Sequence, residues 1–435
     1  MGKTKPTKLA DTKLKRIEAM SREDPACTFE CLMPHYNKEN LIACYHELDG
    51  KKAVGVDKQT KDIYGANLEV NIANLITRMK SMSYRPQPVR EVRIPKDDGK
   101  TRPLGIACIE DKIVQSMTAK LLEAIYEPTF TDESFGFRPG RNCHQAIREV
   151  HQQVFRNWEN YVIDVDLENF FGEIDHSKLL TILRMRIKDE KFIRYIARAL
   201  KSGVLSDEGF RKTEMGSAQG SVCSPILANI FAHYAIDVWV KTVVEQKVEG
   251  AVKLVRYCDD FVICCTNRKD AKRVLRALPK RLERFSLKVN SKKTQCIEMC
   301  KKASRSGRSG TFNFLGFTFY LGPNARGYII PKVKTDGKKY RKKLKEVNQW
   351  CKDNRHLYPL KSLWDQLRVK MRGYIRYYGV SHNSYAVSSF IFRVTRVFFK
   401  WINRRSHRKS VTWEQLQRFI RKYPMPPVKV YHRLF

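Results

Sequence analysis

Residues 254–265 read LVRYCDDFVICC, with two adjacent carboxylates between two runs of β-forming side chains. This pattern predicts a β-hairpin that carries Asp259 and Asp260 at its tip. Neighbouring carboxylates repel each other, and the repulsion grows as the surroundings lose water, so the pair needs a compensating cation. The tip is therefore either a solvated turn or part of a metal site.

A second acidic pair stands upstream, in the stretch YVIDVDLENFF at 161–171. Asp164 and Asp166 are two residues apart, so on a strand they share one face while the apolar residues beside them take the other. If this strand neighbours the hairpin, three carboxylates converge at one end of a sheet. Two magnesium ions need such a set of carboxylates to hold the attacking and leaving oxygens of a phosphoryl transfer.

The chain as a whole has the composition of a folded protein with a polyanionic partner. Its 435 residues, 42% of them hydrophobic, suffice for two or three domains. The 83 Lys and Arg against 45 Asp and Glu leave a net charge of +38, which favours nucleic acid over an anionic membrane as the partner. Because the sequence has neither a run of about 18 apolar residues nor an apolar signal core, we expect a cytoplasmic protein without a membrane partner.

Twelve cysteines are scattered along the chain, several of them within apolar runs, and we expect reduced core residues. One group has a spacing that could bring ligands to a zinc ion if two helices met: Cys27, Cys31, His35, Cys44 and His46. The group contains no C-x-x-C pair, and helical residues four apart often share a buried face. We therefore favour core packing over zinc for these residues.

The remaining pattern predicts a mixture of helices and strands. Residues 88–106 indicate a basic hairpin with its turn at 97–99. Helical periodicity predicts helices within 10–47, 110–127, 176–203, 224–246, 337–352, 358–378 and 385–406. The residues Thr412 to Gln415 have the pattern of a capping box that opens one last helix.

From residue 331 onward the composition changes. This segment contains 27 Lys and Arg against five Asp and Glu, a net charge of +22 over 105 residues. Aromatic residues alternate with the basic ones, and most of these aromatics belong in a helical core. With so few acids the segment cannot pair its own charges, so we expect a separate basic module that binds phosphate.

Several motifs occur in a fixed order around YCDD at 257–260. They read RPLGI and DKIVQ, SFGFRPGRNCHQAI, DVDLENFFGEIDH, SAQGSVCSPILANIFAHY, then SLKVNSKKT and FNFLGFTFY. Together they resemble the reverse transcriptases of the group II intron type, over roughly residues 50–435. The sequence departs from that pattern at Cys258, where Ala is usual, at Gly172, where Asp is usual, and at Ser217-Ala218, where a Pro is usual. No carboxylate is lost by these changes.

The resemblance implies an α+β fold shaped like a right hand. A helical N-terminal extension at 1–49 would precede fingers at 50–160 and a palm with an antiparallel sheet at 161–330. A basic α-helical thumb, or maturase domain, would occupy 331–435. Because no C-x-x-C pair and no H-N-H pattern follow the thumb motifs, we expect no C-terminal endonuclease domain.

The resemblance also implies roles for single residues. Asp166, Asp259 and Asp260 would be catalytic and hold two Mg²⁺ ions, with Asp164 in support. Phe171 would exclude a 2′-hydroxyl from the nucleotide, although it could equally be a core residue. The residues expected to bind the deoxynucleotide (dNTP) are Lys96, Arg102, Phe171, Gln219 and Gly220.

Two further groups follow from the resemblance and from the charge of the C-terminal module. The expected primer grip consists of Phe314, Leu315, Gly316 and Phe317. The expected RNA-binding cluster consists of Arg404, Arg405, Arg408 and Lys409. We expect that cluster to contact intron RNA beyond the reach of a short primer and template.

The implied activity is RNA-directed DNA polymerisation by an intron-encoded protein, which also assists splicing as a maturase and copies the intron into cDNA for retrotransposition. Its partners would be group II intron RNA, an RNA template with a DNA primer, target DNA and dNTPs. One alternative is a related enzyme domesticated for host defence or DNA repair. Two others are an RNA-binding splicing factor with a dormant polymerase and a two-metal nuclease. The intact Asp trio argues against the dormant polymerase, and the expected dNTP residues argue against the nuclease.

Overall fold

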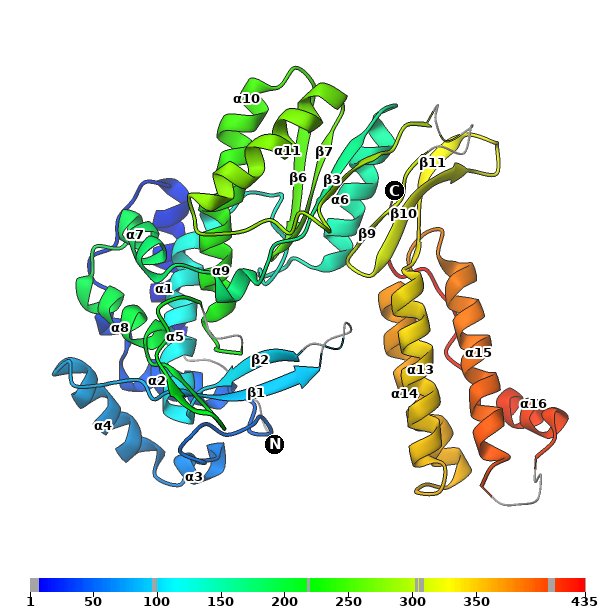
Figure 1. Cartoon of the computed structure of the whole chain (residues 1–435). Helices are drawn as coiled ribbons and strands as arrows, with labels where there is room; N and C mark the ends of the chain where they lie inside the picture. Colours follow the sequence, from blue (N-terminus) through cyan, green and yellow to red (C-terminus); the bar gives the residue numbers. More distant parts are fainter. Residues whose placement is uncertain are drawn as a thin grey trace.

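The computed structural model describes residues 8–95, 99, 101–216, 220–301, 304, 309–405 and 411–434, with residues 8–11 as backbone only. Figure 1 shows the N-terminal helices and the β1–β2 hairpin on one side of the molecule and a helical bundle on the other, with the largest group of strands above and between them. The expectation of mixed α and β structure is confirmed.

The central sheet has the strand order β6-β7-β3-β8, and all of its neighbouring strands are antiparallel. Its strands are β6 (Val252–Tyr257), β7 (Asp260–Cys265), β3 (Tyr161–Val165) and β8 (Gln295–Glu298). The two acidic stretches of the sequence are therefore neighbours, because β3 pairs directly with β7 and Asp164 lies opposite Val262. The expected convergence of the two strands is confirmed.

The two faces of this sheet contact two different hydrophobic cores. Alternate side chains, among them Ile163 and Phe261, belong to a core shared with the N-terminal helices. The side chains between them, among them Val162 and Val262, belong to a second core shared with the C-terminal bundle. Since successive strand residues point to opposite faces, Asp164 and Asp260 lie on the face that the second core covers.

The N-terminal half is mainly helical. Most of its helices contribute to the first core, whereas α6 packs on β6 and β7 in the second core. Helix α1 packs on α5, and α2 packs on both α4 and α5. The α-helices are α1 (Lys8–Glu23), α2 (Lys38–Glu47), α3 (Lys61–Gly65), α4 (Leu68–Lys80), α5 (Ile109–Tyr126), α6 (Cys143–Arg156), α7 (His176–Arg186) and α8 (Glu190–Leu200). Short 3₁₀ turns lie at η1 (Met33–His35), η2 (Glu127–Thr129) and η3 (Phe170–Gly172).

A second four-stranded sheet contains the predicted basic hairpin. Strand β1 (Val89–Pro95) pairs antiparallel with β2 (Thr101–Ile106), with Ile94 opposite Arg102. The short strands β4 (Val204–Ser206) and β5 (Gly209–Arg211) extend this sheet on the other side of β1. The hairpin is confirmed, and in Figure 1 it points from the N-terminal helices toward the helical bundle.

The segment predicted as a helix at 224–246 differs in its winding. It starts as α9 (Ser224–Ala232), continues through the π-helical turns η4 (His233–Asp237) and η5 (Val240–Val244), and ends as α10 (Glu245–Lys247). A π-turn holds one residue more than an α-turn, so it rotates the side chains that follow. The extent was predicted well, but a regular α-period was wrong.

The C-terminal part combines a three-stranded sheet with a helical bundle. The sheet has the order β11-β10-β9, formed by β9 (Phe312–Phe314), β10 (Phe317–Pro323) and β11 (Ile329–Thr335). The bundle contains α13 (Gly337–Asn354), α14 (Leu360–Tyr378), α15 (Ser384–Ile402) and α16 (Trp413–Lys422). Its aromatics Trp364 and Phe398 are fully buried, and Thr412 caps α16 through a capping box, as expected.

In the described part of the chain, we find no helix that combines the length and the apolar character needed to cross a membrane.

Candidate active site

The β6–β7 hairpin presents Asp259 and Asp260 through a two-residue turn. Tyr257 pairs with Asp260, which leaves Cys258 and Asp259 as the turn residues. Cys258 has a φ of +61°, a left-handed conformation that L-residues rarely adopt and that costs about 1–3 kcal/mol. A Cβ atom placed on Gly136 would lie 2.2 Å from the Cys258 sulfur, so this glycine makes room for the strained turn.

Strand β3 brings the second acidic pair to the same place. Asp164 lies within β3, and Asp166 follows directly after the end of that strand. The backbone of Asp166 is held on both sides, because its carbonyl accepts from the Asn290 amide at 2.8 Å and its amide donates to the Thr294 hydroxyl at 3.2 Å. These contacts come from the motif SLKVNSKKT, which thus has a positioning role.

The four carboxylates line one cavity of about 300 Å³. Its lining consists of Asp164, Val165, Asp166, Leu167, Asp259, Asp260, Lys293 and Asn313. The Lys293 ammonium lies 3.3 Å from a carboxylate oxygen of Asp166. Lys293 and Asn313 were not expected from the sequence, because each lies far along the chain from the strands that it approaches.

The carboxylates perturb one another. Burial raises the pKa of Asp260 to about 7, with further contributions from the charges of Asp164 and Asp259. Burial also raises the pKa of Asp164 to about 6 and raises that of Asp259, where the charge of Arg102 acts in the opposite direction. The nearby protein cations therefore compensate the acids only in part.

Hard oxygen ligands of this kind suit Mg²⁺, and a cation in the cavity would relieve the repulsion. Among the described residues, no group of three or more His, Cys, Asp or Glu side chains is arranged to hold a metal ion. The same is true of the group considered for zinc, which is not arranged to hold a metal ion: Cys27, Cys31, His35, Cys44 and His46. Asp166 instead pairs with Lys293.

Beneath the hairpin lies a buried ion pair that the sequence analysis missed. The Arg256 guanidinium donates to both carboxylate oxygens of Asp237 at 2.7 Å, and both side chains are fully buried. Although burial raises the pKa of Asp237, the charge of Arg256 holds it below its ordinary value. The only available signal was an arginine inside an apolar strand sequence.

The same guanidinium fastens the hairpin to two other segments. It donates to the Cys258 carbonyl at 3.0 Å, to the Asn229 side chain at 3.1 Å and to the Ser134 hydroxyl at 2.7 Å. Asn229 in turn donates to the Gly136 carbonyl at 2.6 Å. The motifs SFGF and SPILANIF therefore meet YCDD through one buried arginine.

The expected primer grip forms the β9–β10 hairpin, and the structure divides its four residues. Phe314 and Phe317 are buried in the second core, whereas Leu315 and Gly316 form the turn with φ of +48° and +78°. Positive φ at both central residues is the pattern of a type I′ turn. The Leu315 amide forms a hydrogen bond with Asp260, so the backbone of this turn lies beside the carboxylates.

The expected dNTP residues are described in part, because Lys96 and Gln219 lie outside the described residues. Arg102 is exposed on β2, close enough for its charge to act on Asp259. Phe171 is half-buried in η3 and packs edge-on against the buried Phe170, with ring centroids 5.5 Å apart. This half-exposed ring could contact a nucleotide.

Gly220 brings the loop before α9 close to the basic hairpin. It has a φ of +104°, and a Cβ atom there would lie 2.9 Å from the Gly105 carbonyl oxygen. Next to it, the Ser221 hydroxyl donates to the Gln115 side chain at 2.9 Å. Pro225 stands in the first turn of α9, as expected. The motifs RPLGI and DKIVQ thus meet Gly220 and Ser221 in space.

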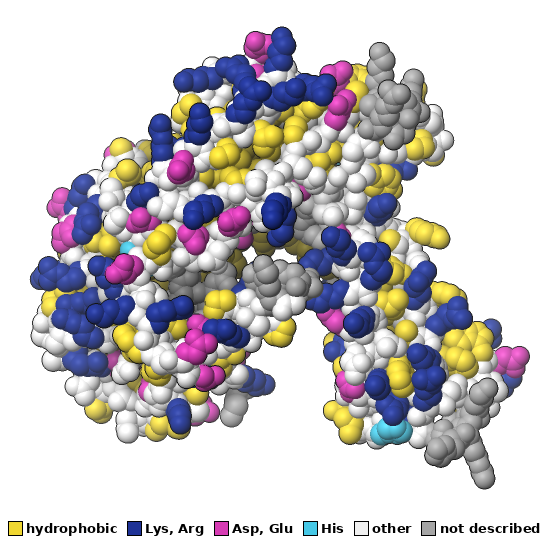
Figure 2. Space-filling view, viewed as in Figure 1, with side chains coloured by type: hydrophobic (Ala, Val, Ile, Leu, Met, Phe, Trp, Pro, Cys, Tyr) yellow, Lys and Arg dark blue, Asp and Glu magenta, His cyan; other side chains and the backbone are white. Residues whose placement is uncertain are grey.

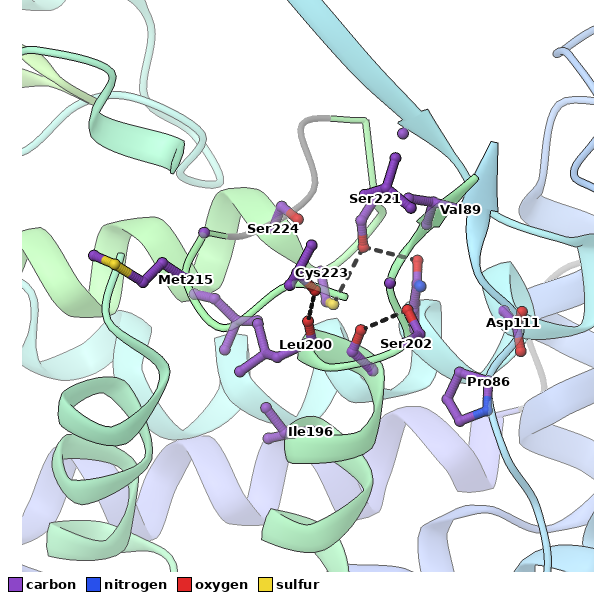
Figure 3. A pocket seen from close by; sticks show the side chains of 18 of the residues that line it. Pro86, Val89, Asp111, Ile196, Leu200, Ser202, Met215, Ser221, Cys223 and Ser224 are labelled. Carbon is purple, nitrogen blue, oxygen red and sulfur yellow. Dashed lines mark hydrogen bonds between the residues drawn. The ribbon is translucent and has the colours of Figure 1, made fainter. Parts of the chain in front are cut away.

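A larger cavity of about 380 Å³ lies beside this contact, beneath the basic hairpin (Figure 3). Its wall includes Ser221 and Cys223 from the loop before α9, Ser224 from the start of α9, and also Val89 and Asp111. It is separate from the carboxylate cavity, since the two share no lining residue.

The expected RNA-binding cluster is described only at Arg404 and Arg405, since Arg408 and Lys409 lie outside the described residues. Arg404 is exposed and lies over the Trp401 ring, 5.3 Å from its centroid. Arg405 is half-buried and donates to the Tyr358 carbonyl at 2.9 Å. The two arginines therefore differ, and only Arg404 presents its charge to the surroundings.

Comparison with known proteins agrees with this geometry. The family described as "Reverse transcriptase (RNA-dependent DNA polymerase)" matches residues 94–319, just over half of the chain. That range contains all four carboxylates of the cavity.

Several curated proteins are similar over about half of the chain. An uncharacterized 91 kDa protein in the cob intron of Schizosaccharomyces pombe is 38% identical over 202 residues, which are 45% of this chain and 24% of that protein. Group II intron-encoded protein LtrA of Lactococcus lactis subsp. cremoris is 34% identical over 51% of this chain and 37% of its own length. Protein YkfC of Escherichia coli K12 is 34% identical over 51% of this chain and 65% of its own length.

These matches thus cover less than two thirds of each relative. With the family match across both acidic strands, they lead to one conclusion: this chain belongs to the reverse transcriptase (RNA-dependent DNA polymerase) family.

Proposed function

We propose that the chain is an RNA-directed DNA polymerase of the group II intron type. The observation that carries this proposal is the convergence of Asp164, Asp166, Asp259 and Asp260 on one cavity, from β3 and the β6–β7 hairpin. The names of two similar proteins, one in an intron and one intron-encoded, support the intron type. The net charge of +38 fits a nucleic-acid substrate.

In this proposal the molecule is a right hand. Fingers at 50–160 follow the helical extension at 1–49, the palm at 161–330 contains the central sheet, and the thumb at 331–435 contains the bundle. Figure 2 supports this assignment, because the surface is hollowed between the β1–β2 hairpin and the bundle. The duplex formed by primer and template would pass through that hollow.

Asp166, Asp259 and Asp260 would hold two Mg²⁺ ions, with Asp164 in support. When bound, the ions activate the primer hydroxyl and neutralise the charge that develops on the phosphates. For Asp166 to take part, its carboxylate must exchange Lys293 for the metal. We propose that Lys293 thereby balances the charge of the site before substrate binds.

The surrounding residues would bind and orient the substrates. Arg102, together with Lys96, would hold the triphosphate, since a guanidinium can donate two parallel hydrogen bonds to a phosphate. Phe171 would press against the sugar and exclude a 2′-hydroxyl. Gln219 and Gly220 would contact the incoming nucleotide, and Gly220 permits the close backbone approach.

On the primer side of the site, the turn at Leu315 and Gly316 would hold the primer terminus beside Asp260. Phe314 and Phe317 would act from the core by fixing that turn. The C-terminal bundle would grip intron RNA with its excess of basic side chains, Arg404 among them, which would allow the protein to assist splicing as a maturase and to copy the intron into target DNA.

The decisive experiment is extension of a DNA primer on an RNA template by the purified full chain. We expect dNTP-dependent extension by the wild type and a loss of about a thousandfold in Asp259→Asn, because several kcal/mol of charge stabilisation would be removed. RNA binding should change little in this variant. Near-normal extension by Asp259→Asn would contradict the catalytic assignment, and cleavage of the template without extension would favour a nuclease.

A further inference from the structure

Helix α11 (Arg268–Glu283) carries the densest basic sequence outside the C-terminal module. Between residues 268 and 293 there are eleven Lys and Arg and only two Asp and Glu. The helix packs with Ala271, Val274, Leu278 and Leu282 against the central sheet. Most of its basic residues therefore lie on the opposite side, whereas Asp270 is buried and Arg281 is half-buried.

The outward side of α11 forms a continuous basic stripe, which we call the α11 ridge. Its members recur every three or four residues, so they share one face of the helix. All six are exposed: Lys269, Lys272, Arg273, Arg276, Lys280 and, just beyond the helix end, Arg284. At 1.5 Å per residue, the ridge is about 22 Å long.

The two acids of this segment compensate little of the charge. Asp270 is buried and accepts from the Glu249 and Gly250 amides, and it lies 3.5 Å from Arg273. Glu283 is exposed at the end of the helix. The other basic members of the ridge thus have no acidic partner within ion-pair distance among the described residues.

The ridge lies away from the proposed path of primer and template. Figure 2 shows Lys and Arg gathered along the rim over α10 and α11, at the top of the view, whereas the hollow opens below the sheet. α11 begins three residues after Cys265, at the end of β7 remote from Asp260. Most of the ridge is therefore out of reach of a substrate held at the carboxylates.

We propose that the α11 ridge is a second nucleic-acid contact, which binds the phosphate backbone of structured RNA outside the catalytic hollow. A duplex carries one charge per about 1.7 Å of its axis, so about 22 Å of ridge faces a matching row of phosphates. The choice of RNA over DNA rests on the proposed function, in which a folded RNA larger than the hollow is the substrate. Because the ridge consists of exposed Lys and Arg on one face of a helix, we expect it to bind phosphates by charge and shape rather than by sequence.

The test compares two variants that lose the same charge. The ridge variant combines K272Q, R273Q, R276Q and K280Q, because glutamine keeps a high helix propensity. The control variant combines K188Q, K191Q, R194Q and K201Q, four exposed basic residues in and around α8. An RNA stem-loop is titrated against each full-length protein after a short primer and template have saturated the hollow.

We expect the ridge variant to bind the stem-loop more than tenfold more weakly at 0.15 M salt. The slope of log K against log salt should become shallower by about 3.6, since four phosphate contacts are lost at about 0.9 each. The control variant should change less than twofold, and primer extension should stay within twofold of wild type in both variants.

Three results would overturn the inference. Equal weakening in the two variants would assign the effect to net charge, and equal binding of a DNA stem-loop would remove the commitment to RNA. A parallel loss of primer extension would place the ridge on the path of the primer and template. Failure of the wild type to extend any primer would instead refute the proposed function, because the binding titration does not depend on catalysis.

Discussion

Two two-residue turns meet at the carboxylate cavity, and they are held in opposite ways. The turn at Cys258 and Asp259 rests on the buried Arg256–Asp237 ion pair, within the fold of the central sheet. The turn at Leu315 and Gly316 is held from the C-terminal part of the chain. The Tyr377 hydroxyl donates to the Leu315 carbonyl at 2.9 Å, and the Asp336 amide donates to the Gly316 carbonyl at 3.0 Å.

The difference follows from what each turn presents to the cavity. The first turn and the residue after it present two carboxylates, and the charge of Arg256 beneath the turn stabilises the charged form of Asp259. The second turn presents only backbone, so neutral hydrogen bonds suffice to place it. Because those hydrogen bonds come from α14 and the segment before α13, the position of the bundle determines the backbone that lies beside Asp260.

The largest effect should come from breaking the support of the first turn. Arg256→Met leaves Asp237 buried without its partner, which should lower the free energy of unfolding by about 3–5 kcal/mol. Urea denaturation measures this change. Asp237→Asn in the Arg256→Met background should recover part of the loss, because it removes the uncompensated charge. If the double variant is as unstable as the sum of the two single variants, the two side chains do not act as a pair.

A smaller effect is expected from adding one carbon to the second turn. Gly316→Ala should lower the free energy of unfolding by about 1–2 kcal/mol, because φ is +78° and alanine disfavours the left-handed region. The new Cβ atom would also lie 3.3 Å from the Tyr378 hydroxyl.

Gly327→Ala is the matched control for that change, since its φ is +80° and a Cβ atom there meets no atom within 4 Å. Both variants should lose similar stability in urea denaturation, but only Gly316→Ala should also reduce primer extension. An equal effect of the two on extension would mean that the turn beside Asp260 has no special role.

The smallest effect should come from removing one hydroxyl. Tyr377→Phe deletes the hydrogen bond to Leu315, so it should lower the free energy of unfolding by about 0.5–1.5 kcal/mol and slow primer extension severalfold. Tyr340→Phe deletes a hydroxyl 3.3 Å from Ser389, within the same bundle and away from the turn. The comparison fails if both variants slow extension alike.

Local patterns in the sequence were enough to predict the chemistry of the site. Period-two alternation predicted that Asp164 and Asp166 share a face and that Asp259 and Asp260 stand on a hairpin, whereas only the resemblance implied that the two strands are neighbours. The extents of most helices followed from apolar periodicity in the same way. These features are local, because strand and helix periods depend on neighbouring residues alone.

The contacts that hold these carboxylates in place depend on the packing of the whole chain. The pairing of Arg256 with Asp237, the approach of Lys293 to Asp166 and the π-turns that place Asp237 all join residues that no local pattern relates. The same holds for Leu315, whose amide reaches Asp260 only because the three-stranded sheet and the central sheet share the second core. Buried polar groups must find partners wherever packing brings them, so their identity depends on the complete fold rather than on spacing along the chain.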